Sequence, residues 1–225
     1  MAPVRMTGVE KSSPEKGFMR QRKQSGFTLI ETLVAMSVFL IATAIGFMSL
    51  APAWRDARVT SAYNATLMSM RQARELAIVN RKTYLLTFNP AGTPVGVNQV
   101  RIQRMDGGAV GPTVSTVALP SDMAFVALAG IPNTNAGAPD NMGTGANGIE
   151  FDIGINNGAA NQIYFFPDGS ARDINNNINN GVVYIARATD LYSSRAITLF
   201  GAAGRVRGWR LYPNSVAGIP QWSQQ

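Results

Sequence analysis

The side chains that most often carry catalysis and metal binding are missing from this chain. Its 225 residues include no cysteine and no histidine, which excludes disulfides and thiolate or imidazole metal sites and removes the commonest general base. A catalytic carboxylate pair would have to come from residues whose spacing shows no pattern, namely Asp140, Glu150, Asp152 and Asp168. No phosphate-binding loop is apparent. We therefore expect no enzymatic activity, no cofactor, no metal and no small-molecule substrate.

Arginines near the C-terminus form the most suggestive polar pattern. Arg205, Arg207 and Arg210 lie in a predicted strand, and no acidic residue follows Asp190 to neutralise them. On a strand, Arg205 and Arg207 point to one face and Arg210 points to the other. Two guanidinium groups one pleat apart can each bind a phosphate, and Trp209 could add a stacking surface. The alternative is a solvated strand whose arginines contact acidic groups of neighbouring molecules.

A single charge interrupts a long apolar run near the N-terminus. Residues 27–51 contain no charged side chain except Glu31, and about 20 apolar residues suffice to span a bilayer as a helix. A carboxylate in the hydrocarbon is costly, so such a residue usually has a functional reason. We expect residues 27–52 to form a transmembrane helix.

The net charge of +7 is concentrated ahead of this run. Residues 1–26 hold six Lys or Arg against two Glu, whereas the remainder holds fourteen basic and eleven acidic residues. Basic residues before an apolar span place the N-terminus in the cytoplasm, so the C-terminal part is expected outside the inner membrane. A small residue, Gly26, precedes the apolar core, whereas a secretory signal has its small-residue cleavage site after the core.

The stretch KQSGFTLIETLVAM, residues 23–36, resembles the leader of type IV pilins and type II secretion pseudopilins. The resemblance implies that a prepilin peptidase cuts between Gly26 and Phe27 and that Phe27 is then N-methylated. It also implies that Glu31 is the acidic fifth residue of the mature chain. The new amine at Phe27 would pair with Glu31 of the same or a neighbouring helix, where the low dielectric strengthens the ion pair and sets subunit register. The alternative is a plain signal anchor with a chance glutamate.

The helix is expected to continue to about Asn80, with a possible bend at Pro52. Apolar residues recur on one face at spacings of three, four and seven, which predicts a buried stripe; they are Val59, Tyr63, Met70, Ala73 and Ala77. Arg71 and Glu75 fall on the opposite, exposed face.

Beyond residue 82 the pattern changes to period two with many turn residues, which predicts an antiparallel sheet. The expected strands are 83–89, 99–105, 113–119, 124–128, 148–153, 162–166, 182–188, 195–200 and 205–212. Residues 130–148 and 172–181 are expected to be mobile surface loops. The fold class is therefore α+β, with a long N-terminal helix packed on a mostly antiparallel, pilin-like head. The expected parts are a leader (1–26), a membrane and assembly helix (27–52) and a periplasmic head (53–225).

Three further stretches narrow the resemblance to H-type minor pseudopilins and FimT-like minor pilins. They are MRQARELAIVNRKTYLLTF (70–88), IYFFPDGSA (163–171) and ITLFGAAGRVRGWRLY (197–212). The resemblance implies a structural subunit of a type II secretion pseudopilus or type IV pilus, whose partners are prepilin peptidase, other pilins and inner-membrane lipid. FimT-like pilins carry a Gly-Arg-x-Arg motif linked to DNA capture, which Gly204, Arg205 and Arg207 match. DNA binding by Arg205, Arg207 and Arg210 is therefore the alternative function.

Overall fold

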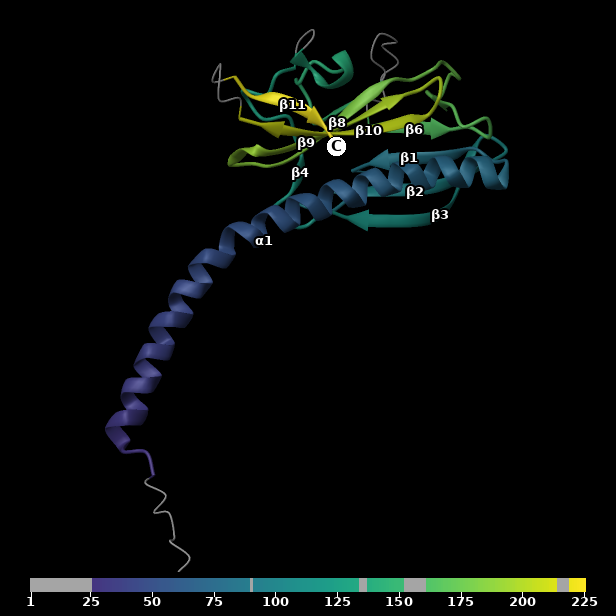
Figure 1. Ribbon diagram of the computed structural model, residues 1–225. Coiled ribbons are helices and arrows are strands. Elements are labelled where there is room, and N and C mark those ends of the chain that lie inside the picture. The colour runs from purple at the N-terminus through teal and green to yellow at the C-terminus, as the bar shows by residue number, and fades with distance from the viewer. Residues whose placement is uncertain (1–25, 90, 134–136, 152–160, 214–218) are drawn as a thin grey trace, which may run out of the picture. The chain divides into compact units, whose positions relative to one another are not determined.

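The computed structural model describes residues 26–89, 91–133, 137–151, 161–213 and 219–225. It divides the chain into two units, residues up to Met48 and residues Ser49–Gln225. One long helix and two antiparallel sheets make up the described chain, which confirms the α+β fold class (Figure 1).

A single helix, α1, runs from Leu29 to Asn80 and includes Pro52 without ending there. Its N-terminus is capped by Thr28, whose hydroxyl accepts a hydrogen bond from the backbone N–H of Glu31 at 3.3 Å. Its C-terminus is followed by Arg81 in a left-handed conformation with φ of 51°, which reverses the chain. The predicted end of the helix at Asn80 is confirmed.

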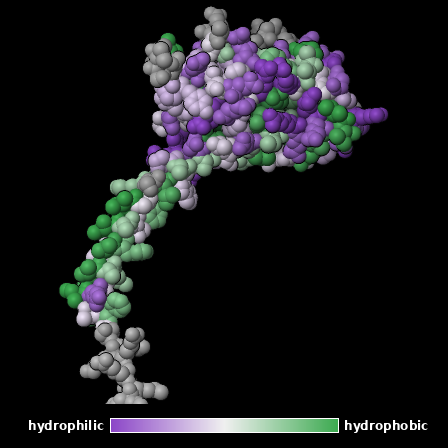
Figure 2. Space-filling view, viewed as in Figure 1, coloured by the Kyte–Doolittle hydropathy of each residue, from purple (hydrophilic) through white to green (hydrophobic). Residues whose placement is uncertain are grey.

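The part of α1 in the first unit exposes apolar side chains on all sides, and the visible face is correspondingly hydrophobic (Figure 2). An 18-residue window of this helix has a mean hydropathy of 2.3, and none of the window is buried. The hydroxyls of Thr32, Ser37 and Thr43 each donate to a helix carbonyl three or four residues earlier. Because these polar groups are satisfied within the helix, the segment suits a hydrocarbon environment.

The second half of α1 buries one face against the head. Val59, Tyr63, Met70, Ala73 and Ala77 are all buried, which confirms the predicted stripe. They join a hydrophobic cluster with side chains from both sheets. Burial of such apolar area is the main free-energy gain on folding, at about 25 cal/mol per Å².

The first sheet has the order β3-β2-β1-β6-β7, and each neighbouring pair is antiparallel. Its strands are β1 (Tyr84–Phe88), β2 (Gln99–Asp106), β3 (Ala109–Ala118), β6 (Gln162–Phe165) and β7 (Ala171–Arg172). The second sheet has the order β11-β10-β9-β8-β4, and β5 also pairs with β8. Its strands are β4 (Ala124–Phe125), β5 (Ile149–Glu150), β8 (Gly181–Arg187), β9 (Asp190–Phe200), β10 (Arg205–Tyr212) and β11 (Gln221–Gln224).

The predicted strands are largely confirmed, with four differences. β3 begins at Ala109 rather than at residue 113, because its pairing with β2 extends to Asp106 and Ala109. β7 and β11 are absent from the expected strands, because each is too short to show a clear period-two pattern; each pairs with the strand just before it in the chain, β6 and β10. β9 begins at Asp190 rather than Arg195, since its polar first residues continue the hairpin with β8. β4 and β5 have two residues each, and part of the predicted strand 148–153 lies outside the described residues.

β8 is the central strand of the core because both of its faces are buried. Val183 and Ile185 pack in the cluster beneath α1, whereas Val182 and Tyr184 pack in a second cluster on the opposite face. Burial raises the pKa of the Tyr184 hydroxyl far above its usual value, and the nearby Glu150 carboxylate raises it further.

Parts of the two predicted surface loops are held against the head by buried side chains and hydrogen bonds, whereas residues 174–178 of the second loop are exposed, as predicted. In the first loop Ile131 is buried, and the indole N–H of Trp222 donates to the carbonyl of Pro132 at 2.8 Å. In the second loop the buried Asp173 carboxylate accepts from the backbone N–H of Asn177 at 2.7 Å and from its side-chain amide at 2.9 Å. These local hydrogen bonds replace contacts with water, which the composition of the loops did not indicate.

Candidate functional site

β10 carries the predicted arginines, between β9 and β11 in the second sheet. Arg205 and Arg207 lie on the same face, as predicted, because both guanidinium groups lie over the ring of Phe200, at 4.8 and 5.4 Å from its centre. Arg210 lies directly opposite Arg195 of β9 in the strand register. The three predicted arginines therefore do not form one surface.

Arg207 is neutralised by an aspartate from the loop that packs on the same sheet. Its Nη1 donates to Oδ1 of Asp140 at 2.8 Å, and the Asp140 side chain is only 7% exposed. The other carboxylate oxygen accepts from the hydroxyl of Thr198 and from Nε1 of Trp209 at 3.3 Å. The prediction that Arg207 is uncompensated is wrong, and Trp209 is half-buried rather than a free stacking surface.

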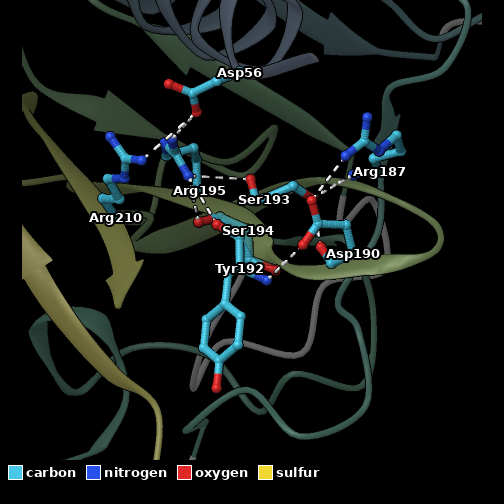
Figure 3. A network of polar contacts seen from close by, with 8 residues as sticks. All are labelled: Asp56, Arg187, Asp190, Tyr192, Ser193, Ser194, Arg195 and Arg210. Carbon is cyan, nitrogen blue, oxygen red and sulfur yellow. Dashed lines mark hydrogen bonds and ion pairs between the residues drawn. The ribbon is translucent and has the colours of Figure 1, made fainter. Parts of the chain in front are cut away.

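Arg210 and Arg195 share a carboxylate from α1, as Figure 3 shows. Oδ1 of Asp56 lies 3.4 Å from Nη2 of Arg195 and 3.6 Å from Nη2 of Arg210. Arg195 is 1% exposed, and its Nη1 also donates to the carbonyls of Ser193 and Ser194, both at 3.2 Å. Burial lowers the pKa of Arg195, and Arg210 lowers it further. Arg210 therefore belongs to an ion-pair network between α1 and the second sheet. The prediction that Arg210 is uncompensated is also wrong.

Arg205 is exposed and has no ion pair among the described residues. It lines a groove of about 600 Å³ together with Arg71 and Arg74 of α1, and Glu75 is the acidic residue in the lining. Nε of Arg74 donates to the carbonyl of Gly169 at 3.2 Å. The β9–β10 turn approaches so closely that a Cβ at Gly204 would lie 1.9 Å from that carbonyl, so only glycine fits.

The N-terminal site comprises Gly26, Phe27 and Glu31, all exposed. Glu31 lies in the first turn of α1, where its charge also interacts favourably with the positive end of the helix dipole. The sequence Thr28-Leu29-Ile30-Glu31 has the form of a capping box, a local signal that sequence analysis missed. Within the described part of the first unit, Glu31 is the single charged side chain and has no ion-pair partner.

Residues 21–47 match the family model described as the prokaryotic N-terminal methylation motif. The match supports the type IV pilin and pseudopilin family. It indicates a prepilin-like substrate of prepilin peptidase that assembles with other pilins, and it points to a structural subunit rather than an enzyme. Together with the apolar N-terminal helix it fits anchoring in the inner membrane. No curated protein and no solved structure matches the chain significantly.

Sequence reasoning missed two aspartates as partners of the arginines. Asp140 is 67 residues from Arg207 and Asp56 is 139 residues from Arg195, so strand and loop patterns could not pair them. One signal was available for Asp56. It precedes Val59 by three residues, so it lies on the helix face that packs against the head.

The remaining carboxylates of the head do not form a shared site in the described residues. Glu150 accepts hydrogen bonds from the Thr144 hydroxyl and the Asn147 backbone N–H, both at 2.9 Å. These bonds hold the loop that directly precedes Glu150. Asp168 caps a turn by accepting from the hydroxyl and N–H of Ser170, and these bonds lower the pKa of Asp168. Asp152 lies outside the described residues. No group of three acidic side chains that could hold a metal occurs in the described ranges.

Proposed function

We propose that this protein is a minor pilin or pseudopilin, of the H-type or FimT-like kind, in a type II secretion pseudopilus or a type IV pilus. In this proposal prepilin peptidase cuts between Gly26 and Phe27, and Phe27 is N-methylated. The N-terminus lies in the cytoplasm and the head in the periplasm before assembly. The supporting observation is that residues 29–47 of the match lie in the exposed apolar part of α1, where Glu31 is the single charged side chain among the described residues.

The exposed apolar half of α1 explains how one chain can serve both as anchor and as filament subunit. In the bilayer its side chains contact lipid, and in a filament they contact the same segment of neighbouring subunits. Neither environment offers water to Glu31, so its charge favours a partner cation. The amine of Phe27 in a neighbouring subunit provides one, and the pairing sets the axial register of the filament.

Processing is tested by coexpressing the full chain with a prepilin peptidase and determining the N-terminal residue by mass spectrometry. We expect N-methylated Phe27 as the first residue. Gly26→Ala should be cut less well, and Gly26→Val should not be cut, because a peptidase site for glycine has no room for a branched side chain. Gly46→Ala is the matched control, since an added Cβ there has no heavy atom within 4 Å. An uncut chain in cells that contain the peptidase would contradict the proposal.

A second candidate function is DNA capture, and the groove next to Arg205 favours it. Arg71, Arg74 and Arg205 line this groove with Glu75, and none of the three has an ion pair in the described ranges. A groove with excess guanidinium groups suits a phosphate backbone. The site would thus use Arg205 with two arginines of α1, in place of Arg207 and Arg210.

DNA capture is tested by measuring the affinity of the full chain in detergent for duplex DNA across a salt series. Two or three phosphate contacts predict a log–log slope of roughly −2 to −3. The double variant Arg71→Gln with Arg205→Gln should flatten this slope, whereas Arg101→Gln on β2 removes one charge elsewhere and should change it little. Equal slopes for the double variant and the Arg101 control would exclude the groove as the DNA site.

A further inference from the structure

The length of the apolar helix places a short segment of the head at the membrane surface. A hydrocarbon core of about 30 Å is crossed by about 20 residues at 1.5 Å per residue. A span that begins near Leu29 therefore leaves the hydrocarbon close to residue 48, and Trp54 and Arg55 follow within about 10 Å. This is the depth of the lipid headgroups, where the protein meets phosphate groups.

We propose that Arg55 and Arg187 bind the phosphate of an anionic phospholipid at this end of the head. The inference rests on the proposed membrane anchoring of α1 but needs no filament. Two adjoining hollows are lined by both arginines together with Asp190. One of them, of about 230 Å³, also has Pro52, Asp56 and Val59 in its lining. The other has Thr189, whose hydroxyl can donate to a phosphate oxygen.

One of the two arginines that line these hollows has no ion pair among the described residues. Asp190 is held by Nη2 of Arg187 at 2.8 Å, and Asp56 is shared by Arg195 and Arg210. Arg55 is exposed and has no acidic partner in the part of the chain that the structure describes. The linings contain two arginines and two aspartates, but both aspartates are held by ion pairs. Arg55 is therefore the lining guanidinium left for a ligand, and it is the one closest in sequence to the membrane span.

Trp54 gives a second, independent sign of the lipid interface. Its side chain is 65% exposed, although tryptophan usually buries most of its large surface in a soluble head. Exposed tryptophan next to arginine is typical of the membrane–water interface, where the indole lies among headgroups and the guanidinium reaches phosphate. Residues 27–51 before it are apolar apart from Glu31, so the phosphates nearest to Arg55 belong to the lipids around the helix.

Lipid selectivity is measured by energy transfer from tryptophan to pyrene in the full chain, reconstituted in phosphatidylcholine nanodiscs. One sample contains a trace of pyrene-labelled phosphatidylglycerol and the other a trace of pyrene-labelled phosphatidylcholine. We expect stronger transfer to phosphatidylglycerol. Arg55→Gln should reduce this preference by about fivefold, since one arginine near an anionic surface contributes about that factor. Arg55 holds no partner in the described head, so the variant keeps the fold.

Arg71→Gln is the matched control, because it removes the same charge from an exposed position on α1 about 24 Å further along the helix. It should leave the preference unchanged. Equal transfer to the two lipids, or an Arg55→Gln variant that keeps the full preference, would overturn the proposal. A preference lost on adding inorganic phosphate at matched ionic strength would assign the hollows to free phosphate instead. A chain absent from the membrane fraction would contradict the proposed anchoring, a separate failure from loss of selectivity.

Discussion

Arg205 and Arg207 are two residues apart on β10, yet they differ in what they contact. Arg207 bonds to the nearly buried Asp140, whose second oxygen is bonded to Thr198 and Trp209. Arg205 is exposed and contacts the ring of Phe200. The two arginines of the Gly-Arg-x-Arg motif are therefore not equivalent. Arg207 has a structural role, whereas Arg205 is available to a ligand.

Substitutions of Arg205 and Arg207 should change the free energy of unfolding of the protein by different amounts. Arg207→Ala leaves the Asp140 carboxylate without its cation and should lower the free energy of unfolding by about 2 kcal/mol. Arg205→Ala loses only a contact at an exposed site and should cost less than about 1 kcal/mol. Urea unfolding of the full chain in detergent micelles measures both values. Equal values for the two variants would contradict the role given to Asp140.

The first turn of α1 both caps the helix and carries the charge of Glu31. Thr28 caps the helix, and Glu31 provides both the capped N–H and a charge at the start of the span. The cap uses the backbone of Glu31 and not its carboxylate. Substitutions at the two positions can therefore separate helix initiation from filament assembly.

Glu31→Gln should be inserted and processed normally but should fail to enter filaments, because it keeps the cap and loses the charge. Thr28→Val loses the cap, at a cost of about 0.5–2 kcal/mol in helix stability, but keeps the charge and should still enter filaments. The measurement is the fraction of each variant in sheared filaments relative to the membrane fraction. Normal incorporation of Glu31→Gln would exclude the proposed pairing with the Phe27 amine.

At the scale of the whole molecule, the head has its own hydrophobic core. Among the described residues, no buried side chain precedes Val59, and the helix face from Val59 to Ala77 completes the cluster beneath the sheets. The ion-pair network of Asp56, Arg195 and Arg210 lies within the same unit, Ser49–Gln225. The head therefore depends on the second half of α1 and not on the first.

A fragment of residues 49–225 should fold as a soluble unit with a cooperative thermal transition. A fragment of residues 65–225 should not, because it lacks Val59, Ala62 and Tyr63, each of which is buried. Near-ultraviolet circular dichroism reports the packing of Trp209 and Trp222 in both fragments. Cooperative melting of the shorter fragment would show that the helix face is dispensable.

Local patterns in the sequence were sufficient for the features that depend on neighbouring residues. The apolar run, the glutamate within it, the helix face from Val59 to Ala77 and most strands follow from residue type and period, since each is determined by side chains a few positions apart. The capping box at Thr28 belongs to the same class and could have been found in advance.

Which arginines have an ion-pair partner depends on contacts between distant parts of the chain. The pairs of Arg207 with Asp140, and of Arg195 and Arg210 with Asp56, join residues far apart in the chain. Folding brings such groups together through the packing of a common core, and no periodicity in the sequence records which loop will cover which strand.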